Sequence, residues 1–122
     1  MTVSADFWLG KKVFVTGHTG FKGSWLCVWL ESMGAVVKGY ALCPSQQTNL
    51  FDSININDDI ESEFNDVRDY PCLLASVKTF SPEIIFHMAA QPLVRQSYKD
   101  PLETFEVNVM GTANILEVTR HC

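Results

Sequence analysis

Short apolar segments recur along the chain at intervals that suit the strands of a parallel sheet. Lys12–Thr16, Val36–Ala41 and residues 84–88 are runs of apolar side chains, and Glu61–Phe64 is a weaker fourth candidate. A strand that is covered on both faces is apolar along its length, without strict alternation. The pattern therefore predicts four strands, with the first and the last as the most deeply buried.

Two longer segments between these strands have helical spacing. In residues 21–33, apolar residues fall every three or four positions and widen into a dense stripe, and Gly34 ends the helix. So apolar a helix should be buried on most sides, with Trp25, Trp29 and Cys27 in the core. In Tyr70–Phe80, Pro71 suits the first turn, and the expected core face consists of Leu73, Leu74, Val77 and Phe80.

A third helix is predicted from Asp100-Pro101 nearly to Cys122. Its expected core face consists of Phe105, Val109, Thr112, Ala113 and Leu116. Residues 43–59 are polar and lack periodicity, so we expect a surface excursion with a short turn near Leu50-Phe51, and a polar loop after residue 88. The order βαβ(α)βαβα predicts one α/β domain over residues 1–122, the first half of a Rossmann-type doubly wound parallel sheet.

The first strand runs directly into a glycine-rich turn, Gly17-His18-Thr19-Gly20-Phe21-Lys22-Gly23, which opens the first helix. Gly17 would allow a tight turn, Gly20 a close approach of a pyrophosphate, and Gly23 close packing of the helix on the sheet. The amide groups at the helix N-terminus would attract the phosphates. A strand before this turn and a helix after it favour dinucleotide binding over an ordinary βα turn.

Charge and composition narrow the possible partners. Nine Lys and Arg against fourteen Asp and Glu give a net charge of −5, with no basic block, which disfavours nucleic acid. No apolar run is long enough to cross a bilayer and the start lacks the features of a signal peptide, so we expect no membrane partner and a cytoplasmic location. The cysteines, Cys27, Cys43, Cys72 and Cys122, have no C-x-x-C spacing, so we expect no metal site and no disulfide.

The glycine turn resembles the cofactor loop of the extended short-chain dehydrogenase/reductases that act on nucleotide sugars. Three further segments resemble that superfamily in order and spacing: Asn65-Asp66-Val67-Arg68-Asp69, Phe86-His87-Met88-Ala89-Ala90-Gln91-Pro92 and Asn108-Val109-Met110-Gly111-Thr112. The resemblance is strongest to the nucleotide-sugar 4,6-dehydratases, with CDP-glucose as the favoured substrate. GDP-mannose dehydratases, sugar-nucleotide epimerases and non-catalytic NAD(P) sensors remain alternatives.

The resemblance implies which residues bind the cofactor. They are Gly17, Thr19, Gly20, Phe21, Lys22, Gly23, Tyr40, Asp66, Val67, Ala89, Ala90, Gln91 and Asn108. Arg95 could contact the substrate or form a structural ion pair. The family's catalytic groups, a Tyr-x-x-x-Lys pair among them, are expected downstream of Cys122, so no catalytic residue is assigned here. The full-length protein is expected to be a homo-oligomer.

The end of the second strand bears on the choice of cofactor. An acid that binds the adenosine ribose is expected roughly twenty residues after the glycine loop, but Tyr40-Ala41-Leu42 stands there, with no Arg nearby for a 2′-phosphate. NAD is favoured because the resembled enzymes use it, and NADP stays open. His18 could bind phosphate or fill the turn, and His87 is expected to be a hydrogen-bonded core histidine rather than a catalyst.

Overall fold

The computed structural model describes residues 2–44 and 50–122. Its centre is a sheet of four parallel strands, β1 (Lys12–Thr16), β2 (Val36–Ala41), β3 (Glu61–Phe64) and β4 (Ile84–His87), in the order β3-β2-β1-β4. All four predicted strands are confirmed, although β4 ends one residue earlier than expected. The expectation that β4 is among the most deeply buried is wrong: β4 is only partly buried, whereas β2 is buried from Val37 to Ala41. The Rossmann-type strand order is confirmed as well, with β1 in the middle of the sheet and fully buried from Val13 to Thr16.

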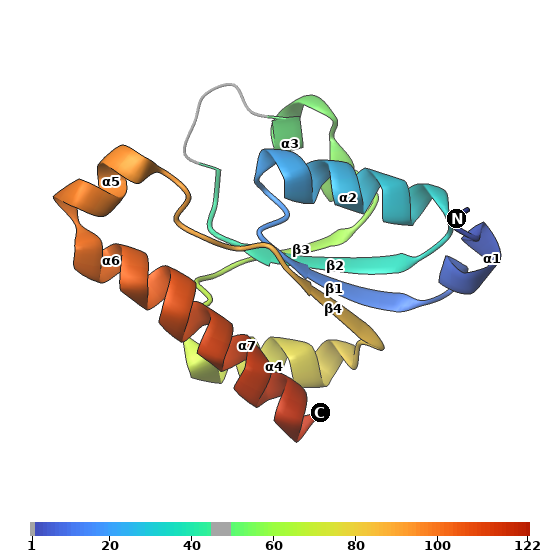
Figure 1. The fold of residues 1–122 in the computed structure, drawn as a ribbon. Coiled ribbons are helices and arrows are strands. Elements are labelled where there is room, and N and C mark those ends of the chain that lie inside the picture. The colour runs from blue at the N-terminus through green and yellow to red at the C-terminus, as the bar shows by residue number, and fades with distance from the viewer. Residues whose placement is uncertain (1, 45–49) are drawn as a thin grey trace.

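Helices cover both faces of this sheet (Figure 1). On one face, α2 (Phe21–Ser32) packs with α3 (Leu50–Ser53) and the short 3-10 turn η1 (Ile56–Asp58) over Val13, Val15 and Val37. On the other face, α4 (Tyr70–Phe80) and α7 (Gly111–His121) pack over Phe14 and Tyr40. The two layers arise because successive side chains along a strand point to opposite faces.

Helix α4 agrees with its predicted bounds and core face. The side chain of Asp69 caps the helix by accepting from the amide of Cys72, and the chain leaves the helix at Ser81 in a left-handed conformation. Leu73, Val77 and Phe80 are buried, and Leu74 packs beside them.

Helix α2 corrects one prediction. Trp25 and Trp29 are 51% and 52% exposed and are not core residues, and Phe21 is also exposed. The buried stripe consists instead of Gly23, Ser24, Cys27 and Leu30. Mostly small side chains face the sheet because the helix lies close to it, and Cys27 is a core residue as expected.

The long C-terminal helix also differs from its predicted register. It begins after the cap residue Asp100 as α6 (Pro101–Phe105), passes through a π-helical turn η2 (Glu106–Met110), and continues as α7. Phe105, Val109 and Leu116 are exposed, so the predicted core face is wrong, and Gly111, Ile115 and Val118 are buried instead. Phe105 lies before the π turn and is already exposed, so the predicted face is one position out of phase from the start of the helix. The partly buried residues Thr104, Val107 and Asn108 are in phase with Gly111, Ile115 and Val118.

Three other segments depart from the sequence analysis. The excursion over residues 43–59 is not wholly at the surface, because Phe51 and Ile56 are buried in the core beneath α2; its residues 45–49 lie outside the described residues. The segment expected as a polar loop contains a helix, α5 (Val94–Lys99). A short helix, α1 (Ala5–Trp8), precedes β1 and was not predicted. No helix in the described part of the chain is long and apolar enough to span a membrane.

Candidate functional site

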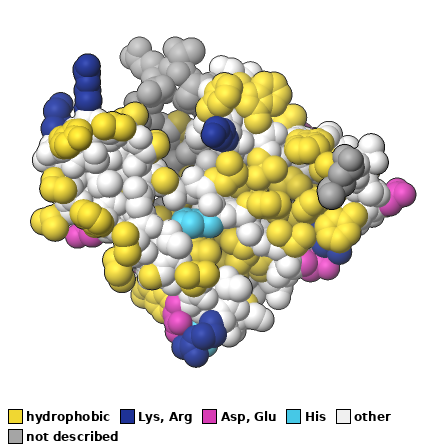
Figure 2. All heavy atoms as spheres, in the orientation of Figure 1, with side chains coloured by type: hydrophobic (Ala, Val, Ile, Leu, Met, Phe, Trp, Pro, Cys, Tyr) yellow, Lys and Arg dark blue, Asp and Glu magenta, His cyan; other side chains and the backbone are white. Residues whose placement is uncertain are grey.

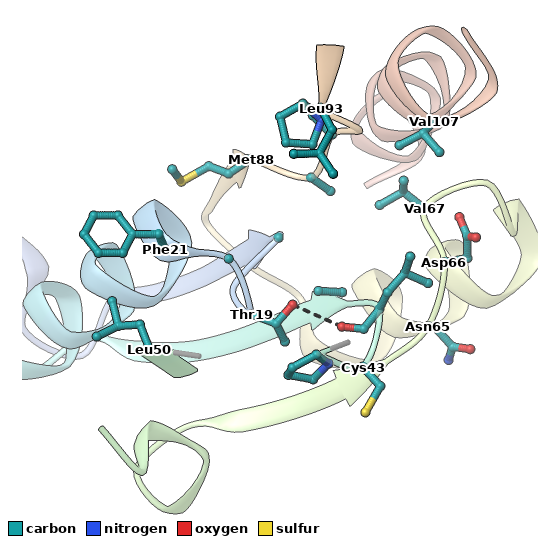
Figure 3. Close-up of a pocket in the computed structure, with 18 residues that line it drawn as sticks. Thr19, Phe21, Cys43, Leu50, Asn65, Asp66, Val67, Met88, Leu93 and Val107 are labelled. Carbon is teal, nitrogen blue, oxygen red and sulfur yellow. Dashed lines mark hydrogen bonds between the residues drawn. The ribbon is translucent and has the colours of Figure 1, made fainter. Parts of the chain in front are cut away.

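A crevice of about 700 Å³ opens at the carboxyl ends of the strands. This is the edge at which open α/β sheets bind their ligands. In Figure 3, Phe21 and Leu50 lie on one side of the opening, Leu93, Val67 and Val107 lie across it, and Met88 lies between Phe21 and Leu93. The residues that line the crevice are Gly17, Thr19, Gly20, Phe21, Ala41, Leu42, Cys43, Pro44, Leu50, Asn65, Asp66, Val67, Met88, Ala89, Ala90, Pro92, Leu93 and Val107.

The three glycines of the turn after β1 differ in what surrounds them. Gly17 has a φ of +77°, and a Cβ there would lie 2.7 Å from the backbone of Met88 and Ala89. A Cβ on Gly23 would collide with the carbonyl group of Gly17. A Cβ on Gly20 would meet only the Gly17 oxygen, at 3.4 Å. Gly17 and Gly23 are therefore required by the fold itself, whereas Gly20 leaves space on the crevice side.

The N-terminus of α2 faces this space with amide groups that have no hydrogen-bond partner in the described part of the chain. The first bond of the helix runs from the amide of Ser24 to the carbonyl of Gly20, at 2.9 Å. The amides of Phe21 and Lys22 precede that bond and have no acceptor within the helix. Together with the helix dipole, they form a site that favours an anion.

His18 points away from the crevice into the protein interior. Its side chain is fully buried, its ring stacks on Phe64 at 6.1 Å, and Nε2 lies 3.0 Å from the Oγ of Ser62. Burial lowers the pKa of His18 to about 4, so the ring is neutral at pH 7. The position favours the interpretation of His18 as a polar filler of the turn over a phosphate ligand.

The carboxyl end of β2 forms the floor beside the glycine turn. The hydroxyl of Thr19 donates to the carbonyl oxygen of Leu42 at 3.0 Å, which joins the turn to the end of β2. Tyr40 does not line the crevice: its side chain is fully buried, and its hydroxyl donates to the carbonyl of Asp66 at 3.2 Å. The prediction of Tyr40 as a contact residue is therefore corrected to a supporting position under the loop after β3.

The loop after β3 forms one wall of the crevice. The Asp66 carboxylate accepts from the guanidinium of Arg68, with an Nη2 to Oδ2 distance of 2.6 Å, and these hydrogen bonds lower the pKa of Asp66. Arg68 also pairs with Glu106 at 3.2 Å. The side-chain amide of Asn114 donates to the carbonyl of Val67 at 2.8 Å. This wall is thus attached to η2 and α7.

The loop after β4 forms the opposite wall and is attached to the same helix. Asn108 in η2 accepts from the amide of Gln91 and donates to its carbonyl. The Gln91 side chain in turn donates to the carbonyl of Leu93 and to the hydroxyl of Thr104. Gln91 and Asn108 do not line the crevice; they hold the backbone of the residues that do.

His87, at the end of β4, lies behind this wall. Its Nδ1 is 2.7 Å from the hydroxyl of Thr16, and its Nε2 is 3.1 Å from the hydroxyl of Thr112. The ring is about half-buried, and burial lowers its pKa. These contacts agree with the expectation of a hydrogen-bonded histidine within the fold.

Most, but not all, of the predicted site residues meet at the crevice. Gly17, Thr19, Gly20, Phe21, Asp66, Val67, Ala89 and Ala90 line it, whereas Lys22 and Gly23 lie on the first turn of α2 outside the lining. Arg95 is exposed on α5 and is also outside it. The sequence analysis missed Ala41, Leu42, Cys43, Pro44, Leu50, Asn65, Met88, Pro92, Leu93 and Val107. Most of these follow strand ends, a rule that could have found them, but no motif marks Leu50 or Val107.

The strand order, the glycine turn between β1 and α2, and the crevice at the switch point define a Rossmann-type fold of the dinucleotide-binding class. The sequence pattern of the family described as GDP-mannose 4,6 dehydratase matches residues 14–122. The chain belongs to this family.

Individual relatives agree with the family assignment. The chain is 56% identical to a CDP-glucose 4,6-dehydratase of Salmonella typhimurium over 97% of its own length and 33% of that protein. It is 33% identical to a GDP-mannose 4,6-dehydratase of Yersinia enterocolitica over 90% of its length and 31% of the relative. The chain thus spans about a third of the length of the relatives that it matches.

Solved structures show the same fold. A UDP-glucose 4-epimerase of Thermus thermophilus in complex with NAD has a TM-score of 0.77 and 32% identity, covering 90% of this chain and 34% of the epimerase. A UDP-glucose-4-epimerase of Stenotrophomonas maltophila with bound NAD and formylated UDP-arabinopyranose has a TM-score of 0.78 and 29% identity, covering 90% and 33%.

Proposed function

We propose that this chain is the NAD-binding part of a nucleotide-sugar 4,6-dehydratase that converts CDP-glucose to CDP-4-keto-6-deoxyglucose. The observation that carries the proposal is the space left by Gly20 between the α2 N-terminus and the crevice. The 56% identity to a CDP-glucose 4,6-dehydratase supports this substrate over GDP-mannose, whose dehydratase from Yersinia enterocolitica is 33% identical.

The residues of the crevice fit a dinucleotide. The amides of Phe21 and Lys22 would bind the pyrophosphate, which would lie against Gly20 because no side chain projects there. Asp66 and Val67 would contact the adenine on one wall. The backbone of Ala89 and Ala90, on the other wall, would lie beside the nicotinamide ribose, held in place by Gln91 and Asn108.

The ribose end of the crevice favours NAD over NADP. Leu42, Cys43 and Pro44 line the crevice where β2 ends, and none of them carries a positive charge. A 2′-phosphate would therefore find no cationic partner among the lining residues of the described chain. NAD-bound epimerases among the similar structures support the same cofactor.

Bound NAD+ would supply a hydride acceptor that takes hydride from C4 of the sugar and returns it to C6 after water is lost across C5 and C6. The residues of this chain would position the cofactor and exclude water from its apolar crevice. Tyr40, Tyr70 and Tyr98 are followed four residues later by Pro44, Leu74 and Leu102, so none of them starts a Tyr-x-x-x-Lys motif. We therefore place the acid–base groups in a longer protein that carries this chain.

The test is an assay of that full-length protein with NAD+ and a panel of CDP-glucose, GDP-mannose and UDP-glucose. The proposal predicts a 4-keto-6-deoxy product from CDP-glucose, with at least tenfold lower kcat/KM for the other two nucleotide sugars. Epimerised product, or a preference for GDP-mannose, would contradict the substrate assignment. NAD+ binding without turnover of any sugar would instead indicate a sensing module.

A further inference from the structure

We propose that His87 is a positioning residue that holds the crevice wall formed by residues 88–91. Its ring is the neutral Nε2–H tautomer and connects β1 to the π turn through a series of hydrogen bonds in which every donor points the same way, from the wall toward Asn108. The structural part of this proposal stands on the hydrogen bonds alone. Its consequence for NAD binding rests on the proposed function.

The first constraint on the tautomer comes from Thr16. Its hydroxyl oxygen accepts from the amide of Met88 at 3.0 Å and from the amide of Ala89 at 3.1 Å. A hydroxyl has two lone pairs and one proton, and both lone pairs face these amides, of which the Met88 amide is shared with the Thr16 carbonyl oxygen at 3.1 Å. The remaining contact, to Nδ1 of His87 at 2.7 Å, must then be a donation from Thr16, and Nδ1 carries no proton.

The second constraint comes from Thr112 and is independent of the first. Its hydroxyl lies 2.6 Å from the carbonyl oxygen of Asn108, which can only accept, so Thr112 is the donor in that bond. Its contact with Nε2 of His87 at 3.1 Å must therefore be a donation from the ring. Nε2 carries the proton, and the two ends of the series require the same tautomer.

Both ends of this series of hydrogen bonds lie at the wall of the crevice. The series begins at Met88 and Ala89, passes through Thr16, His87 and Thr112, and reaches the backbone of Asn108. The side chain of Asn108 forms two hydrogen bonds with the backbone of Gln91, at the other end of the same wall. His87 is the only member of this series in the described structure that contacts both threonines. Replacing it with an apolar residue would leave the Thr16 hydroxyl without an acceptor for its proton and the Thr112 oxygen without its donor, and would break this connection between the wall and the π turn.

The ¹⁵N spectrum of the imidazoles reads the tautomer directly. The full-length protein, labelled with ¹⁵N-histidine and free of nucleotide, should show at pH 7 an unprotonated Nδ1 and a protonated Nε2 for His87, assigned by its loss in His87→Gln. A protonated Nδ1, alone or with Nε2, would overturn the proposal whether or not NAD+ binds. Conversely, failure of the wild-type protein to bind NAD+ would contradict the proposed function, and the tautomer of His87 would be unaffected by that result.

Variants test the positioning role. Glutamine also offers one acceptor and one donor, so His87→Gln should keep NAD+ affinity within about threefold, while His87→Leu should lower it at least tenfold. Should His87→Leu not fold, Thr112→Val and Thr112→Ser form a second matched pair. Thr112→Val removes the hydroxyl and should weaken NAD+ binding at least tenfold. Thr112→Ser keeps the hydroxyl and should bind NAD+ as the wild type does. Equal affinities within both pairs would overturn the positioning role.

Discussion

Asn108 and Gln91 are joined by two hydrogen bonds that resemble the pairing of neighbouring strands. The Oδ1 of Asn108 accepts from the Gln91 amide at 2.7 Å, and its Nδ2 donates to the Gln91 carbonyl at 3.2 Å. A side chain in the π turn thus satisfies the backbone of a loop that has no strand partner. The loop after β4 takes its shape from the helix beside it.

Replacing Asn108 should therefore loosen this wall. We expect Asn108→Ala to lower the free energy of unfolding by about 1–3 kcal/mol, because the Gln91 backbone loses both partners, and to weaken NAD+ binding. Urea denaturation and calorimetric titration measure the two effects. Thr104→Val is the control, since it removes one bond of the Gln91 side chain and the bond from the Thr104 hydroxyl to the Asp100 carbonyl, but leaves both bonds to the Gln91 backbone. If Asn108→Ala were no less stable than this control, the wall would not depend on Asn108.

Gly20 and Gly23 should respond differently to an added side chain. Gly20→Val should fold nearly as the wild type, since a Cβ there meets only one atom and the backbone is extended at φ −78° and ψ 170°. Binding of NAD+ to this variant should weaken at least tenfold, which is about 1.4 kcal/mol. Gly23→Ala should instead destabilise the fold, because its Cβ collides with the Gly17 carbonyl. Unchanged affinity in a folded Gly20→Val protein would contradict the pyrophosphate assignment.

The choice between NAD and NADP should follow the charge at the end of β2. Because Leu42 and Cys43 offer a 2′-phosphate no cation, NAD+ should bind at least as tightly as NADP+ in a competition experiment. Leu42→Arg should shift the ratio of the two affinities toward NADP+. A wild-type preference for NADP+ of tenfold or more would mean that a basic group reaches the site from elsewhere.

The buried His18 should make stability depend on pH. Its pKa is lowered from 6.5 to about 4 in the folded chain, so the unfolded chain binds more protons between these values. Stability from this group is complete above pH 6.5 and is lost as the pH falls toward 4, by roughly 3 kcal/mol at most. His18→Phe keeps a ring against Phe64 and should show a flatter pH profile in urea denaturation. His87 acts in the same direction and is present in both proteins, so equal slopes would refute the His18 assignment.

The exposed edge of β4 should make residues 1–122 self-associate when they are expressed alone. In the described chain, β4 pairs with β1 on one side only, and unpaired strand edges recruit other chains. Hydrophobic side chains also gather on the face between α2 and the long helix in Figure 2. Trp25, Trp29 and Phe105 are among the large hydrophobic residues that are exposed in the described chain. Light scattering should detect oligomers or aggregates, and an assay with CDP-glucose and NAD+ should detect no turnover. A soluble monomer would contradict the first expectation, and turnover would contradict the second.

The sequence predicted the strands and the glycine turn well, because both depend on local residues. The strand β1 is a short apolar run, and the tight turn that follows it needs a positive φ, which Gly17 adopts readily because it has no side chain. The helix faces were harder to predict. Of the four buried positions in α2, Gly23, Ser24 and Cys27 carry small side chains and only Leu30 a large one, because the helix packs closely on the sheet. Hydrophobicity therefore pointed to Trp25 and Trp29 instead.

The remaining errors have non-local causes. In the C-terminal helix the prediction followed the large apolar residues Phe105, Val109 and Leu116, which are exposed. The face that packs on the fold lies one position earlier and holds Thr104, Asn108 and Gly111 ahead of Ile115. Likewise, Leu50 and Val107 line the crevice only because the fold brings separate elements together. The assignment of Tyr40 failed for a similar reason. Its place at the end of the second strand suggested a contact with the cofactor, but its side chain is buried in the core between the sheet and helices α4 and α7.

The most direct test of the account is an NMR titration of NAD+ into the isotopically labelled full-length protein, with amide shifts recorded residue by residue. The account predicts that the largest shifts cluster at residues 17–22, 65–67 and 88–91, the glycine turn and the two walls of the crevice. The shifts should be lost in Gly20→Val, while the spectrum of the free variant remains that of a folded protein. Shifts confined to other parts of the chain, or none at saturating NAD+, would contradict the assignment of this crevice as the dinucleotide site.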